Sequence, residues 1–202
     1  MYHILLSSLL AFIITFYAIP VIIQVARAKK LFDEPDERKI HKKVIPTLGG
    51  LGIFAGFIVA ILIGVPKFSG EVQYFAAAAI VMFFLGIKDD ILVLSAGKKF
   101  LGQVIAAIII IVFGSIRLTN MHGFLGIGEI PVIASYILTF FTVLVIVNSF
   151  NLIDGIDGLA GSLGLLTTAV FGAFFFYNGQ LTYAVIALSL SGSLLGFLIY
   201  NF

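Results

Sequence analysis

Seven apolar stretches, each about long enough to cross a bilayer, constrain this sequence more than any other feature. They cover residues 4–25, 48–66, 72–88, 100–116, 130–148, 159–177 and 181–200. A helix needs about 20 apolar residues to cross the hydrocarbon core, whereas a membrane β-strand alternates polar and apolar residues. The run from Ile105 to Phe113 does not alternate. We therefore expect an all-α, polytopic membrane protein with about seven transmembrane helices, forming one transmembrane domain over residues 1–202.

The composition supports a membrane location and excludes several other classes of protein. Of the 202 residues, 61% are hydrophobic and 11% are charged, whereas soluble domains carry about 25% charged residues. The chain has no cysteine, which excludes a disulfide framework and a thiolate metal site. Its net charge of +2 is too small to indicate a nucleic-acid partner. The partner that the composition does indicate is the lipid bilayer.

Basic residues are divided unevenly between alternate loops. The loops after the first and third runs hold ten of the 12 Lys and Arg residues, and the opposite loops hold only Lys67 and Arg117. Because cytoplasmic loops carry the excess of positive charge, this division predicts an N-terminus outside and Phe202 near the cytoplasm. Eight of the ten Asp and Glu residues lie on the same cytoplasmic face, which orientation does not require. This acidic excess suggests chemistry at that face.

The first candidate site is the pair Asp89-Asp90, at the cytoplasmic end of the third run. Neighbouring carboxylates repel each other, and burial raises the cost of charging both. A divalent cation removes that cost, and Mg²⁺ prefers hard oxygen ligands. A solvated helix end with Lys88 as an ion partner is the simpler interpretation, but an ionisable group at membrane depth favours a functional one.

The second candidate site is the polar segment of residues 148–158. Four polar side chains recur there at every third position: Asn148, Asn151, Asp154 and Asp157. On an α-helix adjacent members of this row share a face but its ends do not, whereas a 3₁₀ turn would align all four. Gly155 and Gly158 let the backbone bend or approach a ligand closely. A simple polar turn between two spans is the alternative, but it needs neither two Asn nor two Asp at fixed spacing.

Two groups of cations complete the set of candidates. The segment before the second run holds Arg38, His41, Lys42 and Lys43. These charges could bind phosphates or lipid headgroups, or they could serve only as an orientation signal. The turn expected at Pro46 and the Gly49-Gly50 pair favour a loop with a defined shape. Lys99, at the start of the fourth run, could neutralise a carboxylate or hold a phosphate, although a lysine that snorkels to the interface explains it equally well.

In this order and on one membrane face, these segments resemble the polyprenyl-phosphate N-acetylhexosamine-1-phosphate transferases. That family includes enzymes that begin O-antigen and teichoic-acid lipid intermediates, and phospho-N-acetylmuramoyl-pentapeptide transferase. The resemblance rests on residues 38–50, 85–90 with Lys99-Phe100, and 148–159. The pattern Asn-x-x-Asn-Leu-x-Asp-Gly-x-Asp-Gly-Leu is highly specific, whereas the Asp-Asp pair alone is not. The basic segment resembles the N-acetylglucosamine branch more than the muramoyl-pentapeptide branch.

The resemblance implies a reaction, a cofactor and a location. The reaction is transfer of a sugar-1-phosphate, in this branch GlcNAc-1-phosphate, from a UDP-sugar donor to undecaprenyl phosphate, with UMP as the second product. The implied cofactor is Mg²⁺, with Mn²⁺ as the alternative. The active face would lie on the cytoplasmic side of a bacterial inner membrane, at the first membrane step of cell-envelope polysaccharide synthesis. A homodimer is a candidate assembly.

The resemblance also implies roles for individual residues. The catalytic residues would be Asp89, Asp90, Asp154 and Asp157. The first two would orient or deprotonate the lipid phosphate, the last two would serve the metal and the nucleotide, and the metal ligands would be Asp90 and Asp154. The expected substrate-binding residues are Asn148, Asn151, Gly155, Lys99, Arg38, His41, Lys42 and Lys43.

One departure from the family and two rival interpretations remain. Family members have about ten or eleven spans, and beyond the point matching Tyr200-Asn201-Phe202 they carry a Gly-Asp metal motif and a His-rich loop. We therefore expect this chain to be the N-terminal part of a larger domain and not to catalyse transfer by itself. An ion-coupled transporter is the first rival, since intramembrane carboxylates also mark ion pathways. An inactive membrane fragment or scaffold is the second. The position of the carboxylates at one face and the absence of matched halves argue against the transporter.

Overall fold

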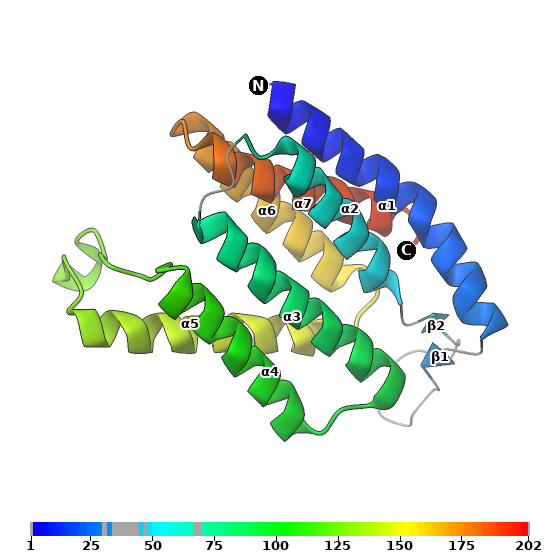
Figure 1. Cartoon of the computed structure of the whole chain (residues 1–202), viewed down its shortest axis with the longest axis horizontal. Coiled ribbons are helices and arrows are strands. Elements are labelled where there is room, and N and C mark those ends of the chain that lie inside the picture. The colour runs from blue at the N-terminus through cyan, green and yellow to red at the C-terminus, as the bar shows by residue number, and fades with distance from the viewer. Residues whose placement is uncertain (1, 30–31, 34–44, 47, 67–69, 202) are drawn as a thin grey trace. The chain divides into compact units, whose positions relative to one another are not determined.

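The described part of the chain is mainly α-helical (Figure 1). The computed structural model describes residues 2–29, 32–33, 45–46, 48–66 and 70–201. The α-helices are α1 (Tyr2–Ala28), α2 (Gly49–Gly64), α3 (Gly70–Leu92), α4 (Ala96–Ile108), α5 (Val132–Ile153), α6 (Leu159–Tyr177) and α7 (Leu181–Leu198). A π-helical segment, Ile109–Phe113, continues α4, and a 3₁₀ turn covers Phe124–Gly126.

The only β-ladder in the described ranges joins two strands of two residues each. Strand β1 (Phe32–Asp33) pairs antiparallel with β2 (Ile45–Pro46), and Phe32 lies opposite Pro46. The ladder brings together residues on either side of positions 34–44. Residues 34–44 lie between these strands and outside the described ranges.

A helix occupies each of the seven positions at which an apolar run was predicted to form one. Five helical stretches are long and apolar enough to cross a membrane, namely α1, α4 with its π-helical continuation, α5, α6 and α7. Helix α2 is apolar but has only 16 residues. The protein is therefore an all-α, multi-pass membrane protein, as predicted. The count of seven spans and the N-terminus outside stay predictions.

One compact unit comprises residues 1–67, 86–92 and 153–202. Within it α1 packs against α2 and α7, and α6 packs against α7. Small residues line these contacts, because lipid is as apolar as leucine and membrane helices associate by close packing rather than by escape from water. Thr15 of α1 is fully buried, and its hydroxyl donates to the Gly52 carbonyl oxygen of α2 at 3.1 Å. A methyl group added at Gly192 of α7 would lie only 3.0 Å from the backbone carbonyl carbon of Ser8 in α1.

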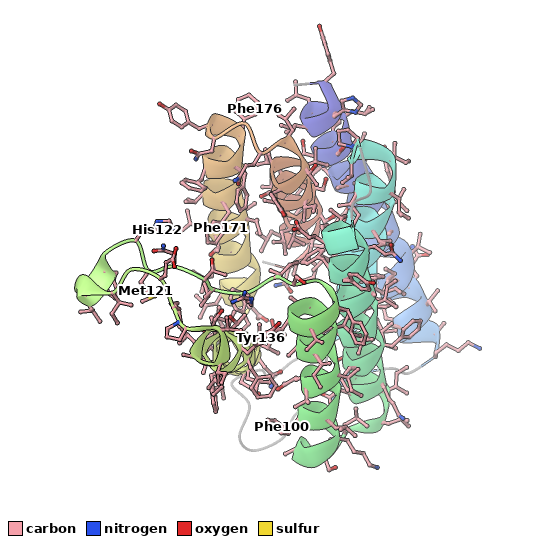
Figure 2. All side chains as sticks on the ribbon, turned by 60° about the vertical axis from the view of Figure 1, so that its left-hand side comes forward. Phe100, Met121, His122, Tyr136, Phe171 and Phe176 are labelled. Carbon is pink, nitrogen blue, oxygen red and sulfur yellow. The ribbon has the colours of Figure 1, made fainter. Side chains whose placement is uncertain are left out.

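The second compact unit comprises residues 68–85 and 93–152. It contains α4, the loop 114–131 and nearly all of α5. Side chains at the start of α5 hold this loop in place: the Leu118 N–H donates to Thr139 Oγ1 at 2.9 Å, and the Ser135 hydroxyl donates to the Leu118 carbonyl oxygen. Arg117 donates to Ser135 Oγ at 3.0 Å, and its guanidinium lies 5.3 Å from the ring centre of Tyr136. Figure 2 labels Tyr136 together with the loop residues Met121 and His122.

Candidate functional site

The predicted acidic segment forms two successive turns directly after α5. The Ile156 N–H donates to the Ile153 carbonyl oxygen at 3.4 Å, and the Leu159 N–H donates to the Ile156 carbonyl oxygen at 3.1 Å. Asp154 and Asp157 therefore occupy the same position, the second residue, in consecutive turns. Gly158 is the third residue of the second turn and has φ 70°. Such a conformation costs an L-residue with a side chain about 1–2 kcal/mol, which explains a glycine at this position.

The three-residue spacing in the sequence thus has two different structural origins. Asn148 and Asn151 lie on the last two turns of α5, which remains α-helical up to Ile153. Asp154 and Asp157 lie in the turns that follow. A single 3₁₀ turn that would align all four side chains does not occur. The two asparagines share one side of a helix, and the two aspartates share one position in a repeated turn.

The carboxyl group of Asp154 has an unusual environment for a residue in an interhelical turn. The residue as a whole is exposed. Nevertheless, partial burial of its carboxyl group raises the pKa of Asp154 above the ordinary value for an aspartate. Burial acts in this direction because it disfavours the charged form of a carboxyl group. A cation that approached this carboxylate would oppose the same penalty.

Asp89 and Asp90 lie in the last turn of α3, which continues to Leu92. Asp89 is partly buried and Asp90 is exposed. Residues 86–92, although they belong to α3, cluster in the same compact unit as residues 153–202. All four carboxylates that the sequence predicted to be catalytic therefore belong to one unit.

The aromatic ring of Phe197, near the end of α7, lies between the first turn of α2 and the first turn of α6. An ideal Cβ built on Gly49 would lie 2.6 Å from Phe197 Cε2, and one built on Gly161 would lie 3.6 Å from Phe197 Cε1. Gly49 follows the basic segment, and Gly161 follows Asp157 by four residues. The structure thus brings the end of the basic segment and the acidic turns to one end of this unit. Sequence reasoning missed Phe197, which looks like any other phenylalanine of an apolar run.

The remaining predicted residues are placed as follows. Arg38, His41, Lys42 and Lys43 lie outside the described ranges. Lys99 is partly buried in the first turn of α4, where its N–H donates to the Ser95 carbonyl oxygen at 3.1 Å. Lys99 belongs to the second unit, as do Asn148 and Asn151.

A second residue that the sequence analysis missed is Gln103. Its side chain is only 7% exposed on α4, and it forms two hydrogen bonds with Asn148 of α5. Gln103 could have been identified from the sequence as a single amide inside an apolar run, because polar side chains within membrane helices commonly form hydrogen bonds to a neighbouring helix.

Comparison with known proteins places this constellation in a family. The sequence profile of glycosyl transferase family 4 matches residues 72–202. The chain belongs to glycosyl transferase family 4. The match includes both acidic segments and the asparagine row, and it begins after the basic segment.

Individual members of the family are similar over most of this chain. The undecaprenyl-phosphate alpha-N-acetylglucosaminyl 1-phosphate transferase of Escherichia coli (strain K12) is 31% identical over 179 residues, which cover 88% of this chain and 48% of that protein. The decaprenyl-phosphate N-acetylglucosaminephosphotransferase of Mycobacterium tuberculosis (strain ATCC 25618 / H37Rv) is 32% identical over 216 residues, covering 98% of this chain and 53% of that protein. The chain therefore spans about half the length of the curated relatives that it matches.

The site can also be tested for its ability to hold a metal ion. Within the described ranges, no three Asp, Glu, His or Cys side chains come together as a ready-made metal cluster. Mg²⁺ does not need one, since it usually keeps several waters and takes one or two carboxylates together with substrate phosphates. The family's acidic residues here are all hard oxygen donors. The donor set in this unit therefore fits Mg²⁺ bound jointly by protein and a phosphate-bearing substrate.

Proposed function

We propose that this protein serves the transfer of GlcNAc-1-phosphate from UDP-GlcNAc to undecaprenyl phosphate, at the cytoplasmic face of a bacterial inner membrane. The observation that carries the proposal is the presence of Asp89, Asp90, Asp154 and Asp157 in one compact unit of a multi-pass membrane protein. The names of the family relatives, which specify polyprenyl phosphate and N-acetylglucosamine, support the choice of substrates. The division of basic residues between alternate loops supports the cytoplasmic face.

The reaction is a phosphoryl transfer without a change of oxidation state. An oxygen of the lipid phosphate attacks the phosphorus that carries the sugar, and the bridging bond between this phosphorus and UMP breaks. UMP leaves with the electron pair, and the lipid gains a diphosphate bond to GlcNAc. Such reactions depend mainly on the alignment of the two phosphates and on neutralisation of their charge. The protein's tasks are therefore to align a membrane-bound acceptor with a soluble donor and to manage negative charge.

The four carboxylates would divide these tasks. Asp89 and Asp90, at the end of α3, would accept the proton of the lipid phosphate and orient its attacking oxygen. Asp90 and Asp154 would hold Mg²⁺, which would neutralise the diphosphate and stabilise the departing UMP. Asp157 would orient the nucleotide end of the donor, and Asn151 would contact a donor group. Burial raises the pKa of Asp154, because it disfavours the charged form of the carboxyl group, and a bound cation would oppose that penalty.

Cations and backbone would complete the donor and acceptor sites. Lys99 and the basic residues Arg38, His41, Lys42 and Lys43 would bind phosphate oxygens. An ideal Cβ at Gly155 would meet no atom within 4 Å, so the backbone there has an open side that a substrate can approach.

The proposal is tested by changing each carboxylate to its amide in the complete protein, in bacterial membranes. Asp89→Asn, Asp90→Asn, Asp154→Asn and Asp157→Asn should each lower transfer at least about tenfold, equivalent to roughly 1.4 kcal/mol of barrier. The assay follows radiolabel from UDP-GlcNAc into lipid in the presence of undecaprenyl phosphate and Mg²⁺. Glu129→Gln is the matched control, because it makes the same chemical change in an exposed loop of the other unit. Rates like wild type in all four variants would remove the catalytic assignment.

A further inference from the structure

The two amide groups of Gln103 and Asn148 form a reciprocal pair that joins α4 to α5 within one compact unit. The Gln103 Nε2 group donates to Asn148 Oδ1 at 3.3 Å, and Asn148 Nδ2 donates to Gln103 Oε1 at 3.0 Å. Asn148 Nδ2 also donates to the carbonyl oxygen of Leu144, one turn earlier in α5, at 2.8 Å. Each side chain is therefore both donor and acceptor toward the other.

The backbone contact determines which way both amides point. The Leu144 carbonyl oxygen can only accept, so the nitrogen of Asn148 must face it. With Asn148 oriented, its oxygen must face the nitrogen of Gln103, and the pair has a single arrangement. A side-chain amide carries two N–H donors. Both donors of Asn148 are engaged, one with Leu144 and one with Gln103, which leaves none for a substrate.

The pair lies just before the part of α5 that leads into the acidic turns. Asn151 follows Asn148 by one turn on the same side of the helix, and α5 ends at Ile153, next to Asp154. The hydrogen bonds between Gln103 of α4 and Asn148 of α5 restrain rotation of the last turn of α5 about the helix axis and its shift along that axis. Loss of one partner would leave a buried amide at Gln103 unpaired, which costs free energy in apolar surroundings.

We propose that Gln103 is a positioning residue, and that Asn148 acts through Gln103 by holding the end of α5 in place rather than by binding the donor. This proposal rests on the transfer reaction proposed above. Sequence reasoning assigned Asn148 to substrate binding together with Asn151. Both asparagines are exposed as whole residues, and the hydrogen bonds divide them: the side chain of Asn148 bonds to Gln103 and Leu144, and Asn151, one turn later, remains the residue for the donor.

The decisive experiment exchanges the two side chains. Gln103→Asn and Asn148→Gln each change the reach of one amide by one methylene group, whereas the double variant keeps the combined reach and both amides. All variants are made in the complete protein and assayed in membranes with UDP-GlcNAc and undecaprenyl phosphate. Gln180→Asn, which shortens an exposed amide ahead of α7, is the matched control. The heat resistance of each detergent-solubilised variant is followed by size-exclusion chromatography.

Each single variant should lose about tenfold in kcat, because an error of about 1 Å in alignment already costs on the order of a hundredfold. The KM for UDP-GlcNAc should stay within about threefold of wild type. The double variant should recover at least half of the loss in kcat, measured on a logarithmic scale. Its heat resistance should recover in parallel.

Two results would overturn the proposal: a double variant no better than the worse single variant, or a KM that rises about tenfold whenever Asn148 is changed. The second result would mean that Asn148 binds the donor directly. Where a single variant yields no folded protein, recovery of the folded peak in the double variant is the deciding measurement. Absence of transfer by the complete wild-type protein would refute the proposed function instead, and the heat-resistance series would still decide whether the pair joins α4 to α5.

Discussion

Replacement of Gly192 with alanine would place a methyl group against the backbone of another helix. An ideal Cβ at this position would lie 3.0 Å from the Ser8 carbonyl carbon and 3.2 Å from the Ser8 Cα, and closer still to the carbonyl oxygen. Non-bonded carbon atoms prefer about 3.5–4.0 Å. No rotation of a side chain can relieve this contact, because the opposing atoms are backbone. Helices α1 and α7 would have to separate by several tenths of an ångström.

The expected change in stability follows from two opposing terms. Overpacking of a close-packed interior costs about 1–3 kcal/mol, and the backbone contact places Gly192→Ala at the upper end. Alanine is a better helix former than glycine by about 1 kcal/mol. The net destabilisation should therefore be about 2 kcal/mol. Gly86→Ala, in α3, is the control: its Cβ would meet no atom within 4 Å, so only the favourable term of about 1 kcal/mol remains.

The assay is unfolding of the purified protein in mixed micelles by increasing amounts of dodecyl sulfate. The chain has no tryptophan, so the helical circular dichroism signal is followed in place of fluorescence. Gly192→Ala should shift the midpoint to less denaturant, and Gly86→Ala should leave it unchanged or raise it. Equal midpoints for the two variants would refute the close approach of α1 and α7 at Ser8.

Two further predictions concern the acidic turns and the orientation. Gly158→Ala should destabilise the fold by about 1 kcal/mol, because residue 158 has a left-handed backbone conformation. Gly155→Ala should leave the unfolding curve unchanged but lower transfer in the radiolabel assay. Equal stability of the two variants would contradict the turn geometry. Cysteines introduced at Ser95 and at His122, both exposed in a chain without native cysteine, should react with an impermeant maleimide from opposite sides of the membrane. Labelling of both from the same side would contradict the alternation of basic loops.

The apolar runs predicted where helices occur, but not where they end. Helix α3 continues past the charged pair Asp89-Asp90 to Leu92, and α4 begins at Ala96, before Lys98 and Lys99. Hydropathy marks the part of a helix that suits lipid, whereas the backbone hydrogen-bond ladder continues as long as the local sequence permits. The predicted boundaries at residues 88 and 100 therefore made the two helices too short, and Asp89 and Asp90 are helical rather than in a loop.

The site was predictable in its residue types but not in its connections. The spacing of Asn and Asp between 148 and 157 predicted a functional segment, since few structural roles need that pattern. It could not show that the pattern divides into a helix end and two turns. The pairing of Asn148 with Gln103, and the position of the Phe197 ring, depend on which helices meet. That information is carried by packing between distant segments, and a single sequence does not reveal it.

The contact between Gly192 and Ser8 joins the first described helix to the last, and this has a consequence for biogenesis. A nascent chain is inserted from its N-terminal end, so α1 enters the bilayer long before α7 has been synthesised. Until then the hydroxyl groups of Ser7 and Thr15, both fully enclosed in the finished protein, face lipid or an early neighbour. Helix α2 can relieve part of this exposure, because the Thr15 hydroxyl bonds to Gly52. Completion must wait for α7, as in other topologies where contacts between distant segments form late. An insertase or chaperone that shelters α1 during this interval should therefore raise the yield of the protein.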